Sequence, residues 1–218
     1  MPLELIVPGD KEETIAYATS HLARAIQAAY TERGKCSLAL SGGSTPKAIY
    51  EQLRKKPLEW SRIDLFWSDE RSVPPDHPDS NYRMALEAFG DLPFGSLHRM
   101  VAESDIEAHA AAYADLLPRS LDIVMLGMGA DGHTASLFPG TSALQEEVRL
   151  VVPVYVEEKK GWRMTLTFPC IEAAKMAVVY IIGEGKAEML RAVMGGADVP
   201  INRVQGIAIA DKKAASLL

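Results

Sequence analysis

The chain has 218 residues, of which 48% are hydrophobic and 24% charged, as in an ordinary globular domain with a sizeable core. Its formal charge of -6 gives no general attraction to nucleic acid or to an anionic membrane, so neither is an expected partner. The start lacks the basic and apolar regions of a secretion signal, and no apolar stretch is long enough to cross a bilayer, which predicts a cytoplasmic protein. Two cysteines, Cys36 and Cys170, stand outside any Cys-x-x-Cys or His-rich setting, so we expect no metal site.

The hydrophobic pattern predicts strands and helices that alternate along the chain. Apolar residues recur at helical spacing over residues 12–31. Thr45 and Pro46 are expected at the N-cap and the first position of a second helix. The other expected elements are strand 37–41, strand 63–67, helix 80–89, helix 105–117, strand 121–126, the apolar runs 150–156, 164–168 and 177–182, helix 186–194 and the apolar run 207–210. This alternation predicts one α/β domain, residues 1–218, with a mostly parallel sheet flanked by helices on both faces.

Polar or glycine-rich sequence follows three of the expected strands, at residues 41–45, 68–71 and 127–133. Ligands of open parallel sheets bind beyond the carboxyl ends of the strands. The three segments are therefore the first candidates for a functional site.

The first of these segments, around Gly42 and Gly43, joins a strand to a helix. Two glycines allow a ligand to approach the backbone closely, and the N–H groups of Ser44 and Thr45 at the helix start would favour an anion. The spacing is not that of a P-loop. From this segment alone, phosphate binding and a simple strand-to-helix turn are equal alternatives.

The glycines of residues 127–132 match the G-x-G-x-x-G pattern of dinucleotide-binding proteins. That pattern requires a full helix after the glycines, within a unit of about 30 residues. Here Pro139 and Gly140 interrupt the chain too soon, so we do not expect a nicotinamide cofactor.

A histidine and an aspartate stand together in the same segment. His133, at the polar end of a buried strand, could take a proton at neutral pH. Asp131, two residues earlier, could orient the ring and stabilise its charged form. The alternative is that His133 only caps the following turn.

Three basic residues are candidates for holding an anion. Arg71 follows Asp69 and Glu70 at the end of a strand and could bind phosphate through two hydrogen bonds, although a salt-bridged strand end is the commoner arrangement. Arg163 precedes an apolar run. Lys186 stands in the first turn of an expected helix, where a cation is unfavourable unless an anion lies nearby.

Six segments of the chain, in this order, resemble the 6-phosphogluconolactonase family. They are residues 41–46, 67–74, 80–84, 126–140, 163–167 and 185–186, and the fourth, with the sequence LGMGADGHTASLFPG, is the most specific. The resemblance implies a modified Rossmann-like α/β fold and a hydrolase without metal or cofactor. Its reaction would convert 6-phospho-D-glucono-1,5-lactone to 6-phospho-D-gluconate in the oxidative branch of the pentose phosphate pathway.

The resemblance also assigns roles to residues. His133 is similar to the family's general base, and Asp131 would support it. The substrate, chiefly its phosphate, would be surrounded by Gly42, Gly43, Ser44, Thr45, Arg71, Arg163 and Lys186. Residues 200–204 depart from the Pro-Ala-Ser usual in the family, so the role of that loop stays open.

Two other functions fit less well. A glucosamine-6-phosphate deaminase would have a glutamate five residues after the histidine and a tyrosine after the Asp-Glu pair, where this chain has Phe138 and Arg71. A sugar-phosphate sensor would need a DNA-binding segment, and residues 1–35 predict a single helix rather than a helix-turn-helix.

Overall fold

Seven parallel strands form the central sheet in the computed structural model, which describes residues 3–218. Their order across the sheet is β1-β10-β9-β6-β2-β3-β5. Their bounds are β1 Leu3–Ile6, β2 Cys36–Leu40, β3 Ile63–Trp67, β5 Ser96–Leu97, β6 Ile123–Gly127, β9 Ala177–Ile181 and β10 Gly206–Ala210. The central strands read as almost continuous apolar runs because helices or loops cover both faces, as is usual for parallel strands.

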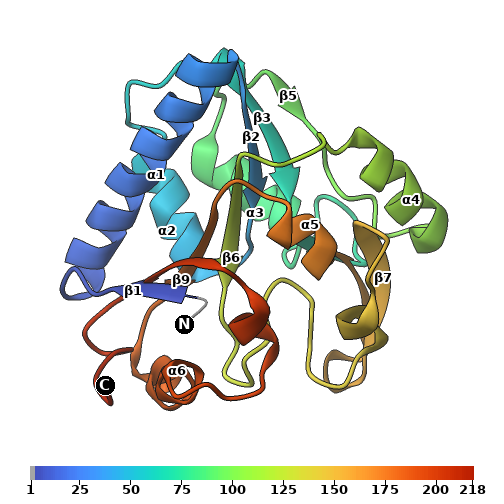
Figure 1. Cartoon of the computed structure of the whole chain (residues 1–218). Coiled ribbons are helices and arrows are strands. Elements are labelled where there is room, and N and C mark those ends of the chain that lie inside the picture. Colours follow the sequence, from blue (N-terminus) through green and yellow to red (C-terminus); the bar gives the residue numbers. More distant parts are fainter. Residues whose placement is uncertain (1–2) are drawn as a thin grey trace.

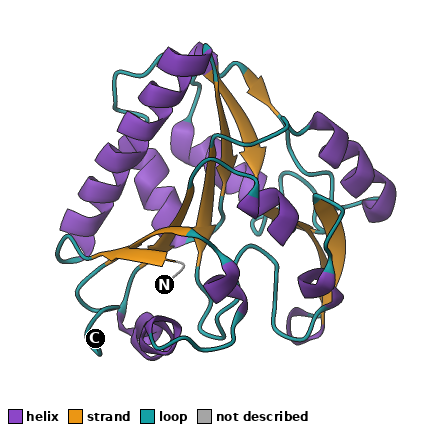
Figure 2. Cartoon of the chain, viewed as in Figure 1, coloured by secondary structure: helices purple, strands orange, loops and turns teal. Residues whose placement is uncertain are grey.

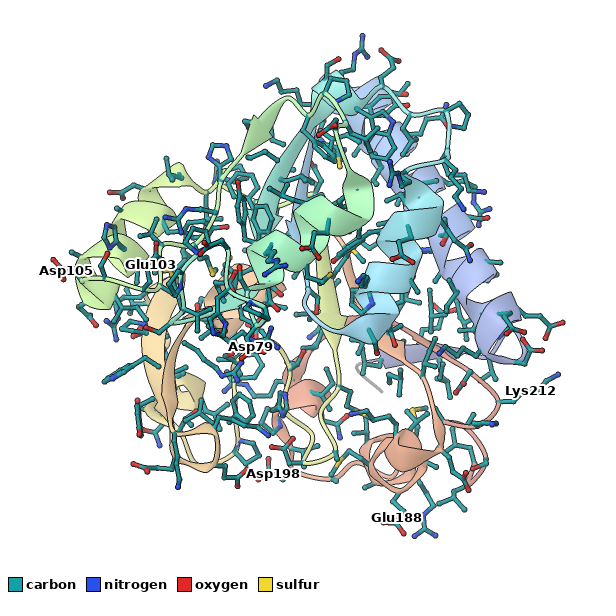
Figure 3. All side chains as sticks on the ribbon, turned by 180° about the vertical axis from the view of Figure 1, so that it is seen from behind. Asp79, Glu103, Asp105, Glu188, Asp198 and Lys212 are labelled. Carbon is teal, nitrogen blue, oxygen red and sulfur yellow. The ribbon has the colours of Figure 1, made fainter. Side chains whose placement is uncertain are left out.

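Helices cover both faces of this sheet, as the sequence predicts. The crossovers through α1 (Lys11–Arg33), α2 (Ser44–Leu53) and α3 (Asn81–Phe89) advance across the sheet in one direction, so right-handed connections place these three helices on one face. Figure 1 shows α5 (Phe168–Glu172) in front of the strands, and Figure 3, from behind, shows α2 and α3 in front. The remaining helices are α4 Ile106–Leu116 and α6 Ala187–Met194, and the 3-10 turns are Trp60–Arg62, Ser142–Gln145, Glu157–Lys159, Glu184–Lys186 and Pro200–Arg203.

A second, antiparallel sheet lies apart from the parallel one (Figure 2). It consists of β4 (Asp69–Arg71), β8 (Gly161–Leu166) and β7 (Val151–Val156), in that order. The apolar run 164–168 is divided between two elements, since β8 ends at Leu166 and Phe168 begins α5. Only residues 157–160 join β7 to β8, and so short a connection permits an antiparallel hairpin but no parallel crossover.

Two predicted helix starts are displaced in the structure. The N-cap of α2 is Gly43, with a φ of 104°, and not Thr45; Pro46 is then the third helical residue. Glycine readily adopts this positive φ, and the sharp turn allows the helix to begin two residues early. Lys186 closes a 3-10 turn and is the N-cap of α6, so it stands just before the helix rather than within its first turn.

A buried carboxylate joins elements at the amino end of the sheet. Asp122 Oδ2 accepts hydrogen bonds from the backbone N–H and the hydroxyl of Ser37, and Oδ1 accepts from Arg33 Nε and Lys175 Nζ. Burial acts to raise the pKa of Asp122, but these donors outweigh it and hold the pKa below its usual value. The carboxylate therefore ties α1 to the starts of β2, β6 and β9 in its ionised form.

No helix within residues 3–218 is both long and apolar enough to span a membrane.

Candidate active site

A cleft of about 260 Å³ opens at the carboxyl ends of the parallel strands, beside the small sheet. All three polar strand ends contribute to it. Its lining residues are Ser41, Gly42, Gly43, Asp69, Arg71, Asn81, Gly127, Met128, Gly129, His133, Ala135, Arg163 and Lys186. The cleft thus brings together the predicted histidine, both predicted arginines, the lysine and the two glycines of the first loop.

Asp131 and His133 form a close pair in the loop after β6. His133 Nδ1 lies 2.5 Å from Asp131 Oδ1, and the backbone N–H of His133 donates to the same oxygen at 3.2 Å. A carboxylate can only accept here, which places the ring proton on Nδ1. Nε2 is therefore the nitrogen left to exchange a proton with a ligand.

Two opposing effects act on the carboxylate of this pair. Burial acts to raise the pKa of Asp131, whereas the charge and the hydrogen bonds of His133 lower it more strongly. The net shift is downward, so Asp131 stays ionised and can balance a positive charge on the ring.

The glycines after β6 shape the loop around His133. A Cβ on Gly129 would lie 2.1 Å from His133 Nδ1, so only glycine fits beside the ring. Gly132 has a φ of 80°, and its carbonyl accepts from the backbone N–H of Ile201 at 3.0 Å. A Cβ there would lie 2.7 Å from Val199. The two glycines therefore allow the His133 loop to pack against the loop that begins at Pro200. That second loop is the segment where the sequence departs from the family pattern.

Phe138 lies close to both His133 and Arg163. Its ring stacks on the imidazole, and the guanidinium carbon of Arg163 lies 5.7 Å from the ring centroid. The phenylalanine is buried and comes five residues after the histidine. It therefore restrains both the histidine and the arginine.

Arg71 and Arg163 stand opposite each other on β4 and β8. Like charges in such cross-strand positions repel one another. Within residues 3–218 neither arginine forms an ion pair with a carboxylate. Burial, supported by the charge of Arg71 and opposed by Asp69, lowers the pKa of Arg163 below its usual value. Two guanidinium groups without an ion-pair partner, with Lys186 in the same lining, form a site suited to an anion.

The two acidic residues before Arg71 do not hold its guanidinium directly. Glu70 is buried and accepts from the backbone N–H groups of Asn81 and Tyr82 and from the hydroxyl of Ser80, which anchors the start of α3. Burial raises the pKa of Glu70, although the backbone N–H groups of Asn81, Tyr82 and Arg71 oppose this shift. Glu70 is thus a helix anchor rather than a ligand of the cleft.

The sequence analysis did not place Asp69 or Asn81 among the site residues, although both line the cleft. Asp69 Oδ2 accepts from the hydroxyl of Ser136 at 2.6 Å. Two sequence signals point to Asn81: its place in the family-like segment 80–84, and its position immediately after the N-cap serine of α3.

Ser44 and Thr45 lie outside the lining of the His133 cleft. They face a neighbouring cavity of about 700 Å³, between the starts of α1 and α2 and the loops after β9 and β10. Gly42 and Gly43 line the His133 cleft, whereas the next two residues line this cavity. Within the described part of the chain, no cluster of three or more His, Cys, Asp or Glu side chains could hold a metal ion.

The model of the family described as glucosamine-6-phosphate isomerases/6-phosphogluconolactonase matches residues 9–212. The chain belongs to this family. A 6-phosphogluconolactonase of Nostoc sp. is 39% identical over 84% of this chain and 82% of its own length. One of Synechocystis sp. is 40% identical over 82% of this chain and 78% of its own. The predicted family is confirmed, and with it the prediction that the chain is a hydrolase.

Solved structures of the family show the same fold. A 6-phosphogluconolactonase from Trypanosoma cruzi superposes with a TM-score of 0.88 at 30% identity, covering 99% of this chain and 97% of that one. A monomeric glucosamine-6-phosphate deaminase superposes with a TM-score of 0.85 at 24% identity, which shows a shared fold alone. The predicted modified Rossmann-like α/β class is therefore confirmed.

Proposed function

We propose that this protein hydrolyses 6-phospho-D-glucono-1,5-lactone to 6-phospho-D-gluconate, the lactone-opening step of the oxidative pentose phosphate pathway. One observation carries the proposal: a carboxylate-supported imidazole and two arginines without carboxylate partners face the same cleft. A lactone that carries a phosphate needs both groups, one to activate water and one to hold the anion. The names of the relatives favour the same substrate.

In this proposal the phosphate fixes one end of the sugar. Arg71 and Arg163 bind it through charge-assisted hydrogen bonds, with Lys186 adding positive charge. Gly42 and Gly43 allow close approach of the ligand to the backbone. The N–H groups of Ser44 and Thr45 at the start of α2 add partial positive charge, which favours the phosphate anion. The bound phosphate also removes the repulsion between the two arginines.

The chemical step uses His133 as general base. Nε2 takes a proton from a water molecule as the water oxygen attacks the lactone carbonyl carbon, giving a tetrahedral oxyanion. Backbone N–H groups of the cleft, or an arginine, stabilise the oxyanion. The C–O bond of the ring then breaks, and His133 returns the proton to the departing ring oxygen. Asp131 stabilises the imidazolium between these two transfers.

The proposal needs no cofactor and no covalent nucleophile. A positioned base contributes about 10²–10⁴-fold to a rate, and a strained lactone already opens slowly in water. We further propose that residues 1–218 act as one domain in the cytoplasm. The free, buried thiols of Cys36 and Cys170 are in keeping with a reducing compartment.

The test is the release of protons on adding fresh 6-phosphogluconolactone, with the uncatalysed rate subtracted. The wild type is compared with His133→Ala. Fast release that the substitution abolishes supports the reaction and the base together, whereas release unaffected by it removes His133 from the role. No release above background from folded wild type contradicts the lactonase proposal. Ammonia formed from glucosamine 6-phosphate would favour the deaminase instead.

A further inference from the structure

Asp69 and Arg71 occupy the same face of β4, yet they do not form an ion pair. Residues two apart on a strand point to the same side, so a carboxylate and a guanidinium at these positions are natural partners. Both side chains line the cleft. The described ion pairs nevertheless include neither residue. Asp69 and Arg71 are instead hydrogen-bonded to neutral groups, Ser136 for the former and the Asp79 carbonyl for the latter, and one further neutral group contacts both.

That group is the side-chain amide of Asn81, which is only 1% exposed. Its Nδ2 donates to the backbone carbonyl of Asp69 at 2.9 Å and to Oδ1 of the same residue at 3.2 Å. Its Oδ1 accepts from Arg71 Nη1 at 2.5 Å. A primary amide can donate to an acid and accept from a base at once, so Asn81 bonds to both members of the pair.

We propose that Asn81 is a positioning residue that keeps Arg71 from pairing with Asp69 and so leaves the guanidinium open to a phosphate. Among the acceptors of residues 3–218, Asn81 and the carbonyl of Asp79 bond to Arg71, and both bond to Nη1 of its guanidinium. Nε and Nη2 stay available to an anion. The phosphate as ligand rests on the proposed function, whereas the arrangement of the three side chains does not.

The surroundings of Asn81 hold its amide in this orientation. The backbone N–H of Asn81 donates to Glu70 at 2.8 Å, which anchors the residue at the first position of α3. On the other side, a Cβ on Gly42 would lie 1.9 Å from Asn81 Oδ1, so the glycine loop packs directly on the amide. Figure 3 labels Asp79 in the loop before α3, the residue whose carbonyl accepts from Arg71 at 2.7 Å. Strand β4 and the glycine loop thus both contact this amide.

The alternative state explains why such a residue is useful. If Arg71 paired with Asp69, a phosphate would have to break that ion pair before it could bind. With Asn81 in place the guanidinium is already oriented, so binding of the anion requires no such rearrangement.

The experiment measures the binding of inorganic phosphate by titration calorimetry, which does not depend on turnover. It compares the wild type, Asn81→Ala, Asp69→Asn and the double variant. Asn81→Ala should weaken phosphate binding roughly tenfold, because Arg71 can then pair with Asp69. In the Asp69→Asn background, Asn81→Ala should weaken phosphate binding by roughly threefold at most, because no carboxylate is left at position 69 to pair with Arg71.

If Asn81 had a purely structural role, Asn81→Ala would lower phosphate affinity equally in the wild type and in Asp69→Asn, and that result would overturn the inference. Unchanged phosphate affinity in Asn81→Ala would overturn it as well. Asn202→Ala is the matched control: its amide donates to the carbonyls of Val193 and Ala197, away from the cleft. This control should lower the melting temperature without weakening phosphate binding. A wild type that binds phosphate but does not open the lactone would contradict the proposed function and leave the role of Asn81 standing.

Discussion

The ring of Phe138 lies 3.9 Å from the ring of His133, centroid to centroid, and the two planes meet at 26°. With Asp131 bound to Nδ1, the imidazole is restrained both in its plane and across its face. A general base depends on such restraint, because a small displacement from the reacting geometry can cost about 10²-fold in rate.

Phe138→Leu should therefore lower kcat between about tenfold and a hundredfold while the protein stays folded. The aliphatic side chain keeps part of the apolar contact but loses the flat face on which the imidazole rests. Steady-state kinetics with the lactone and a thermal melt measure the two effects. Phe94→Leu serves as a control, since Phe94 makes edge-to-face contacts with Trp60 and Phe89 outside the cleft lining and should affect stability alone. Equal kcat in Phe138→Leu and wild type would remove Phe138 from the catalytic geometry.

Asp131→Asn should reduce kcat by about 10²-fold or more, with a much smaller effect on KM. The amide can still contact Nδ1, but it carries no charge to stabilise the imidazolium. The comparison is with Asp198→Asn, which removes one acidic charge outside the His133 cleft (Figure 3) and should leave kcat unchanged. If the loss in Asp131→Asn fell on KM instead, Asp131 would act in substrate binding.

Arg163→Gln should make the ligand-free protein more stable while it weakens substrate binding. The change removes one of two cations that face each other on β4 and β8, and relief of such repulsion is worth about 0.2–1 kcal/mol. Urea unfolding without ligand and KM for the lactone report the two effects. Arg149→Gln removes an arginine paired with Glu107 and Glu146, so it should give no stabilisation. A less stable Arg163→Gln protein would mean that the arginine is not repelled in the ligand-free state.

Stability in acid should depend on Asp122, whose pKa is held below its usual value in the folded protein. A lowered folded pKa means that the ionised group stabilises the fold above the unfolded pKa, and that this contribution disappears as the pH falls through the folded pKa. Asp122→Asn should thus lower the free energy of unfolding at pH 7 by about 3 kcal/mol, and the difference should shrink towards zero in acid. Urea titrations from pH 7 down to the acid limit of folding measure it. A difference that stays constant with pH would show that the ionised form contributes nothing.

The sequence predicts the parallel sheet and the place of the cleft because both follow from local signals. Apolar runs mark the central strands, and polar sequence at the three strand ends marks the edge where a ligand would bind. Contacts between distant short segments are less predictable. The strand β4 has only three residues, and its pairing with β8 is what sets Arg71 opposite Arg163.

Asn81 illustrates what a local reading of the sequence leaves out. It stands in the family-like segment 80–84 at the start of a helix, but that segment does not show which side chains it contacts. Its role depends on Asp69 and Arg71, which stand on a strand that no propensity signal predicts, and on a glycine from a different loop. Tertiary contact, not the local pattern, decides which polar side chain enters the cleft.

The pairing of β1 with β10 has a consequence for how the protein is made. Within residues 3–218, β1 hydrogen-bonds to β10 alone, so Leu3 is the partner of Gly206. During translation, Leu3–Ile6 therefore cannot pair until β10 has been synthesised. Contacts of such long sequence separation slow folding. The β1 edge of the sheet is therefore completed late, and until then its unpaired strand is exposed to aggregation.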